Sequence, residues 1–428
     1  MRATLVVVVA SLTAGALTAP ATAQERRGLG STLRRWEQDL RQQAGTARER
    51  WEEERRIELR MTLGELRGRL SPPPPAPDWT PRAWGAGRLE RGPGGVPILH
   101  LRGTPEEMGA QHGHLLKGEI RALTSYMRSF VPARERPAAL ARARELFLAA
   151  TPPDHLREAR ALAEAAELPL DELLFAQWFT DLYRLFACTC VGTPSDEGPL
   201  LARNLDFPGM GYLGRYSLVV AARPAGKRPY LSVSWPGLLG VLSGMNEGVA
   251  LAVMVVHRAA PVAGVPFQLA FRRALEEAGD AGEVEGLLRS LPLTVTNNLM
   301  VVDRAGAARV LELHPDHEIT VRRPDARGRV VSTNHFRGEE EPFRPSLTHL
   351  SSLLRYQRAA GVARRQAGPF SLARAREALG KTASRTLTQQ SMVFLPARGQ
   401  VEVALRDRPP ATDGAWVRLD LEALLRTP

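Results

Sequence analysis

The sequence changes character at residues 186–190, Phe-Ala-Cys-Thr-Cys. Before this point, charged residues alternate with Leu and Ala at the three-to-four spacing of amphipathic helices. After it come short apolar runs rich in β-branched residues, which are typical of strands. The two cysteines of the chain, Cys188 and Cys190, both lie at this boundary. Thiols two positions apart are poorly placed for a structural disulfide, so we expect them to be present for reactivity.

The hydrophobic pattern predicts a layered α+β protein, with antiparallel sheets packed under helices. The expected strands are residues 96–101, 217–222, 230–234, 249–256, 299–302, 310–313, 319–321, 392–395, 401–405 and 416–419. The expected helices are residues 134–150, 154–187, 267–278, 284–291 and 348–363. A further helix is expected after Thr104, which would cap it ahead of Pro105, with Glu107 completing a capping box.

The N-terminal part of the chain is expected to lie outside the main domain. Residues 1–23 have the form of a secretory signal peptide, so the protein is expected to be exported, to a periplasm or out of the cell. Residues 24–70 are predicted to form a charged helical extension that could contact a membrane surface or a partner protein. Residues 71–77 form a proline-rich linker. The main domain then divides into a helical segment, 78–187, and a catalytic segment, 188–428.

Charge and motifs argue against several classes of function. The net charge of +11 is spread along the chain without a dense basic block, so no nucleic-acid partner is expected. His112 and His114 lack further ligands at metal-binding spacing, and we expect neither a metal nor a cofactor. Residues 209–214 match G-x-G-x-x-G but lead into an expected strand, which favours a loop over a dinucleotide site.

Nucleophilic catalysis by a cysteine is the class of function that these arguments leave. A thiol needs a base to become a good nucleophile. One solution is a histidine elsewhere in the fold, with His335 or His112 as the candidate in an uncut enzyme. The other makes Cys188 the first residue of a chain, after a cut behind the small residue Ala187, so that its own α-amine is the base.

Downstream of the cysteines, two charged residues could assist. Arg203 and Asp206 could pair with each other and hold the amine or the thiolate in place.

Several short motifs occur in a recognisable order over residues 95–420. They are Gly103-Thr104-Pro105, Gly109-Ala110-Gln111-His112-Gly113, Cys188-Thr189, Arg203-Asn204-Leu205-Asp206, Gly244–Ala250, Ser332-Thr333-Asn334-His335 and Ser384-Arg385. Together they make the chain resemble the acyl-coenzyme A:6-aminopenicillanic acid acyltransferase (isopenicillin N acyltransferase) family. That family consists of self-cleaving cysteine N-terminal-nucleophile hydrolases and is distantly related to the choloylglycine hydrolases.

The resemblance implies an αββα four-layer sandwich of antiparallel sheets between helices, and cleavage at Ala187–Cys188 into two chains that stay associated. It implies that Cys188 is the nucleophile and that Arg203 and Asp206 organise the amine and the substrate pocket. It also implies that Asn334 stabilises the oxyanion. Arg385 is implied as a further catalytic or pocket residue, with Thr189, Ser384 and His335 in support.

The sequence departs from the family at three points. Ala187 replaces a glycine of the penicillin enzyme, and Cys190 stands where relatives have Ser or Thr. Met254-Val255-Val256 stands where bile-salt enzymes have a second oxyanion Asn, so a backbone N–H would have to serve.

The expected function is cleavage of a linear carbon–nitrogen amide bond in a small acyl-amide or peptide, through a thioester on Cys188. Two alternatives remain open. One is a noncatalytic exported protein of the same fold that docks to a membrane or partner. The other is the uncut thiol hydrolase with a histidine base.

Overall fold

The computed structural model describes residues 73–183, 187–257, 260–338, 347–365 and 370–426. These residues all belong to one compact unit. The expected signal peptide, the helical extension and the first two linker residues lie outside the described residues. No helix in the described ranges is long and apolar enough to span a bilayer.

The first sheet has ten strands in the order β1-β2-β3-β6-β7-β8-β9-β10-β11-β12. Neighbours run antiparallel except β3 and β6, which are parallel. The strands are β1 Arg82–Trp84, β2 Gly87–Arg91, β3 Pro97–Gly103, β6 Leu218–Pro224, β7 Tyr230–Ser234, β8 Ser243–Met245, β9 Val249–Val255, β10 Asn297–Asp303, β11 Ala308–Leu313 and β12 Thr320–Arg322.

The second sheet has six antiparallel strands in the order β13-β4-β5-β14-β15-β16. They are β13 Val330–Ser332, β4 Ala187–Ser195, β5 Gly198–Asp206, β14 Thr388–Leu395, β15 Gln400–Leu405 and β16 Trp416–Asp420.

The helices are α4 Pro105–Leu115, α5 Lys117–Ser129, α6 Arg136–Phe147, α7 Pro153–Ala165, α8 Leu170–Tyr183, α9 Phe267–Glu277, α10 Ala281–Arg289, α11 Leu347–Arg364, α12 Leu372–Thr382 and α13 Leu421–Arg426. Short 3-10 helices span η1 Pro93–Gly95, η2 Ala133–Glu135, η3 Leu213–Tyr216, η4 Pro396–Arg398 and η5 Ala411–Asp413.

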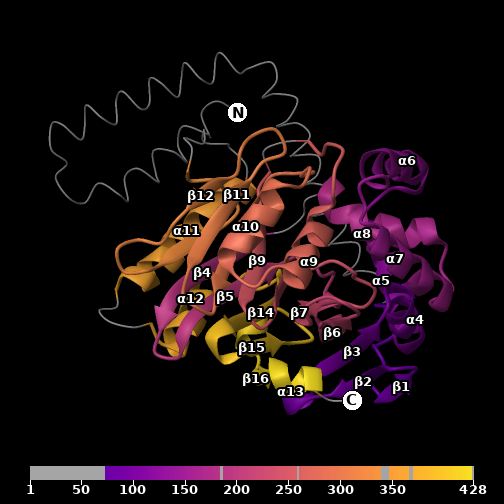
Figure 1. Ribbon diagram of the computed structural model, residues 1–428, viewed down its shortest axis with the longest axis horizontal. Coiled ribbons are helices and arrows are strands. Elements are labelled where there is room, and N and C mark those ends of the chain that lie inside the picture. The colour runs from indigo at the N-terminus through magenta and orange to yellow at the C-terminus, as the bar shows by residue number, and fades with distance from the viewer. Residues whose placement is uncertain (1–72, 184–186, 258–259, 339–346, 366–369, 427–428) are drawn as a thin grey trace. The chain divides into compact units, whose positions relative to one another are not determined.

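These elements form four layers (Figure 1). The two sheets pack face to face: Gly192 of β4 lies so close to β10 that a side-chain carbon there would be 3.2 Å from Met300 Sδ and from Val302. Helices α9 and α10 cover the outer face of the first sheet, and α11 and α12 cover the outer face of the second. The predicted αββα sandwich is confirmed.

Helix α4 shows why the sequence folds locally as predicted. Thr104 accepts a hydrogen bond from the Glu107 backbone, and the Glu107 side chain returns one to the Thr104 backbone, so the capping box is present. Gly109 and Gly113 face α7, where any side chain would overlap the carbonyl of Glu158 or the helix around Ala165. This part of the family motif therefore has a packing role.

A buried charge cluster ties the segment before Cys188 to the segment after it. Arg272 of α9 donates to Glu158 of α7 at 2.6 Å and to Glu276 at 2.7 Å. His155 Nε2 lies 3.3 Å from the same Glu276 carboxylate. A buried cation needs such partners because an unpaired charge is costly inside a protein.

The predicted strands and helices after Cys188 are confirmed within a few residues, but the predicted helix 154–187 is wrong in its extent. It is two helices, α7 and α8, separated by a turn in which Glu167 has a positive φ of 53°. Strand β4 already begins at Ala187, so Cys188 lies in a strand. Strand β5 carries Arg203 and Asp206 and was also not predicted.

Candidate active site

Strands β4 and β5 form the floor of the site, and their alternation decides which side chains meet. Cys188 is paired with Leu205, and Cys190 with Arg203. Paired residues share a face of the sheet. Cys188, Cys190 and Arg203 therefore face the first sheet, whereas Thr189 and Asp206 face α11 and α12.

Arg203 holds the thiol of Cys188 in the space between the sheets. Its Nη2 atom lies 3.3 Å from Cys188 Sγ and donates to the Val253 carbonyl at 3.0 Å. Its Nη1 atom donates to the Ser243 hydroxyl. Burial raises the pKa of the Cys188 thiol, and the Arg203 guanidinium opposes that shift. The thiol is therefore protonated at rest, although a thiolate formed during a reaction would be stabilised.

Asn334 contacts the other reactive atom of Cys188, its backbone nitrogen. The Cys188 N–H donates to Asn334 Oδ1 at 2.8 Å. Asn334 Nδ2 donates to the carbonyl of Val255 at 2.8 Å, and the Asn334 backbone N–H donates to the Ser352 hydroxyl at 2.7 Å. Val255 belongs to the Met254-Val255-Val256 segment that departs from the bile-salt enzymes, and here its carbonyl orients Asn334.

The segment that carries Asn334 is held from the first sheet. Asn298 of β10 donates through its Nδ2 atom to the carbonyl of Thr333 at 2.9 Å and to the carbonyl of His335 at 2.8 Å. These two hydrogen bonds hold the backbone of the residues immediately before and after Asn334, and so fix the position of Asn334.

Asp206 lies on the opposite face of β5 from Arg203, because residues three apart in a strand point in opposite directions. The expected direct pair between them is absent from the described contacts. Thr388 donates to Asp206 Oδ1 at 2.5 Å, and the Ser384 backbone N–H donates to Thr388 Oγ1 at 2.7 Å. Burial raises the pKa of Asp206, opposed by Arg355, the Thr388 hydrogen bond and Arg203.

Of the remaining predicted residues, Thr189 and Ser384 lie near this centre, whereas no described contact brings Arg385 to it. Thr189 is buried next to Cys188 and its hydroxyl accepts a hydrogen bond from Arg355 at 3.1 Å. Ser384 begins the turn between α12 and β14, and Arg385 follows it with an exposed side chain. Cys190 is buried and free, and burial raises the pKa of its thiol as well.

The two histidines considered as alternative bases make hydrogen bonds elsewhere. His335 Nδ1 lies 2.8 Å from the Ser352 hydroxyl, and burial together with His349 and nearby arginines lowers its pKa to about 3. His112 Nε2 accepts a hydrogen bond from the Gly237 N–H at 2.9 Å, and burial lowers its pKa to about 3. Neither described contact leads to Cys188.

Sequence reasoning missed Arg355, which lies on α11 and reaches the reactive residue. It donates through Nη1 to the carbonyl of Cys188 and through Nη2 to Asn334 Oδ1 at 2.8 Å. Ser352, Arg355, Ala359 and Val362 recur at helical spacing and are all buried. A lone arginine in such an apolar series is the signal that could have identified it.

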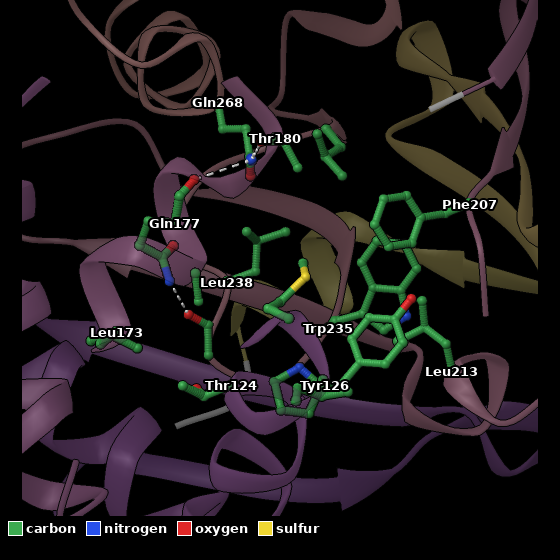
Figure 2. A pocket seen from close by; sticks show the side chains of 16 residues that line it. Thr124, Tyr126, Leu173, Gln177, Thr180, Phe207, Leu213, Trp235, Leu238 and Gln268 are labelled. Carbon is green, nitrogen blue, oxygen red and sulfur yellow. Dashed lines mark hydrogen bonds between the residues drawn. The ribbon is translucent and has the colours of Figure 1, made fainter. Parts of the chain in front are cut away.

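Figure 2 shows a pocket that holds about 560 Å³ of empty space, part of it open to solvent. Its wall includes Phe207 and Leu242, which directly adjoin Asp206 and Ser243 in the sequence. The lining is mostly apolar and aromatic, as it is in most small-molecule sites.

Both segments of the chain build this cavity. Residues of α5 and α8 line it from before Cys188, and the stretch 235–238 lines it from after Cys188. Within the described part of the chain, no group of three or more His, Cys, Asp or Glu residues is arranged to hold a metal ion.

Comparisons with known proteins point to one enzyme family. A family model described as acyl-coenzyme A:6-aminopenicillanic acid acyl-transferase matches residues 193–394. The predicted resemblance to this acyltransferase family is confirmed.

One curated relative is the acyl-coenzyme A:6-aminopenicillanic-acid-acyltransferase 40 kDa form of Emericella nidulans. It is 26% identical over 251 residues, which cover 56% of this chain and 69% of the relative. A solved structure, a Caenorhabditis elegans N-acylethanolamine-hydrolyzing acid amidase orthologue, covers 49% of this chain and 93% of its own, with 16% identity and a TM-score of 0.39. The family match supports an enzyme of the acyltransferase class.

Proposed function

We propose that this protein is a self-processing cysteine amidohydrolase or acyltransferase that cleaves a linear amide through a thioester on Cys188. The observation that carries the proposal is the pair of contacts at one residue. Arg203 lies against Cys188 Sγ, and Asn334 accepts from Cys188 N. A nucleophile and the future amine base are thus both already held by side chains.

The proposed self-cleavage begins with attack of Cys188 Sγ on the carbonyl carbon of Ala187. The Ala187–Cys188 peptide bond breaks, its nitrogen takes a proton and becomes the free α-amine, and the acyl group is left on sulfur. Water then hydrolyses this thioester, which releases the carboxylate of Ala187 and the thiol of Cys188. The two chains would remain associated through the buried cluster of Arg272 and Glu158.

The proposed reaction repeats this chemistry on a substrate amide. The α-amine accepts the thiol proton, and Sγ attacks the amide carbonyl. Asn334 then stabilises the tetrahedral oxyanion, a contribution worth several kcal/mol in comparable sites. The amine returns the proton to the leaving nitrogen, and water resolves the thioester. Export, expected from residues 1–23, favours water over coenzyme A-linked transfer.

The cavity suggests what the acyl group looks like. Tyr126, Phe207, Trp235 and Leu238 surround it, so an apolar acyl group would fill it. An N-acyl amino acid, an acyl-homoserine lactone or a lipid amide has such a group.

The test combines intact-mass measurement with an amide panel. Wild-type protein should separate under denaturing conditions into two pieces that meet at Ala187–Cys188, and should hydrolyse a member of the panel. The Cys188→Ala variant should stay uncut and inactive. The Cys190→Ala variant is the matched control, because it removes the neighbouring buried thiol and should still be cut.

Other outcomes point to the alternatives. An uncut but active wild type that loses activity on His335→Ala substitution would favour a histidine-based thiol hydrolase. A well-folded wild type that is neither cut nor active would favour a noncatalytic protein, whose 24–70 extension docks to a membrane or partner.

A further inference from the structure

Arg355 is a buried cation whose hydrogen bonds all go to polar groups without a formal charge, and it also interacts electrostatically with the Asp206 carboxylate. It is 5% exposed. Its guanidinium donates to the Cys188 carbonyl, the Thr189 hydroxyl, Asn334 Oδ1 and the Ser351 hydroxyl. The salt bridges described for the chain include none for Arg355. Burial lowers the pKa of Arg355, but a guanidinium titrates so far above neutrality that it stays charged.

This cation is directed at the atom that self-cleavage would turn into an amine. Cys188 N and Arg355 Nη2 each lie 2.8 Å from the same acceptor, Asn334 Oδ1. The two nitrogens are therefore no farther apart than twice that distance. The Cys188 nitrogen is an amide in the uncut chain, and it stands in for the α-amine of the cut chain.

A fixed positive charge at this distance disfavours a second positive charge. A nearby like charge shifts a titration by one or more pH units, and more so where water is excluded. A free α-amine in water titrates at about 7.7–8.0 and would be mostly protonated at neutral pH. A protonated amine cannot accept the proton of the thiol.

We propose that Arg355 is a positioning residue whose charge keeps the freed α-amine of Cys188 neutral at neutral pH. This role rests on the proposed function, in which self-cleavage frees that amine. Arg355 would not touch the substrate. It would fix the amide of Asn334 and make the amine ready to act as a base.

Other charged or titratable groups lie around Cys188 and also act on the amine. Arg203 of β5 adds a second cation beside the thiol. Asp206 of β5 is the carboxylate that would act in the opposite direction; burial raises its pKa, and Arg355 and the hydrogen bond from Thr388 oppose that shift. His335 is neutral because of its lowered pKa, and burial keeps the Cys190 thiol protonated.

The test is the pH dependence of kcat/KM for the cut enzyme on its best panel substrate. Arg355→Gln keeps hydrogen-bond donors and removes the charge, and Arg355→Lys keeps the charge and loses the planar fork. The acidic limb of the profile should move upward by about one pH unit or more in Arg355→Gln and stay in place in Arg355→Lys. Thr189→Val, which removes only a hydroxyl partner of Arg355, should also leave it in place.

A purely structural role predicts a different pattern. Both Arg355 variants would then lose kcat to a similar extent with an unmoved acidic limb, and this result would overturn the proposal. Intact mass shows whether each variant has cut itself. An uncut wild type would mean that the proposed function fails, whereas a cut wild type with an unmoved limb in Arg355→Gln rejects the role of Arg355 alone.

If the Arg355 variants fail to fold or to cut themselves, the α-amine of Cys188 can be titrated directly in the wild-type protein. Cut wild-type protein labelled with 15N-cysteine carries one cysteine amine, because Cys190 stays within the chain. Its nitrogen resonance should titrate at least about one unit below the 7.7–8.0 of a free α-amine. Titration at or above that range would rule the proposal out.

Discussion

At the scale of single residues, the site is built around the two reactive atoms of Cys188. Its sulfur faces the space between the sheets, where Arg203 donates to it. Its nitrogen is held by Asn334, which Arg355 contacts from the helix side of the same sheet. The thiol and the amine are thus controlled from opposite faces of one strand, so substitutions on the two faces should have separable effects.

Ser243 provides a test of the sulfur side. Ser243→Ala removes the hydroxyl that fixes Arg203 Nη1 and should lower kcat about tenfold, because the guanidinium is less well placed against the sulfur. The cost in stability should be about 1 kcal/mol, as for one lost hydrogen bond. Activity assays and urea unfolding measure the two effects.

The matched control is Ser391→Ala. Ser391 is also a buried sheet serine, but it donates to Asn204 on the far face of β5. Equal losses of activity in both variants would contradict a specific role of Ser243.

At the scale of elements, helix α9 is joined to α7 by ions that water does not reach. Arg272, Glu158 and Glu276 are each about 2% exposed. Removing one partner of such a cluster leaves the opposite charges buried and unpaired. The resulting loss in free energy of unfolding exceeds what the intact pair contributes to stability. The cluster thereby makes residues before Cys188 a required part of the folded domain.

Arg272→Met should therefore destabilise the protein by about 3–5 kcal/mol, because Glu158 would lose its paired cation in a buried position and Glu276 would keep only Lys227 at 2.8 Å. Arg273→Met removes the neighbouring arginine of the same helix, whose pair with Glu277 is partly exposed. It should cost less than about 1 kcal/mol. Urea unfolding of both variants measures the difference, and similar midpoints would argue against the cluster.

The limits of sequence reasoning are also visible at this scale. Cys188 and Asn334 lie in short local motifs, and the structure brings them together. The expected Arg203–Asp206 pair is not among the described contacts, because the two residues lie three apart in strand β5 and so point to opposite faces. The expectation was wrong because the sequence pattern did not predict this strand. Arg355 was missed because its role depends on how α11 packs on β4, which is long-range information that local patterns do not contain.

At the scale of the whole molecule, the fold holds histidines in a neutral state. Burial lowers the pKa of both His112 and His335 to about 3. In the unfolded chain a histidine titrates at about 6.5. Between these values the unfolded state binds protons that the folded state does not, so stability falls as the pH falls from about 6.5 towards 3.

Urea unfolding at pH 7.5, 6.0 and 5.0 should show this progressive loss. His112→Gln keeps an acceptor for the Gly237 N–H and removes the titrating ring, so its stability should fall less steeply over the same range. His317→Gln, at an exposed position, is the control and should follow the wild type. A slope in His112→Gln equal to that of wild type would contradict the assignment.

The pocket of Figure 2 takes its walls from both sides of the Ala187–Cys188 bond. In a cut enzyme, the piece without the nucleophile would therefore still help to choose the substrate. Changes confined to α5 and α8 could alter acyl preference while the chemistry at Cys188 stays intact. The first piece would then contribute to selectivity without contributing to reactivity, although the second piece lines the same pocket.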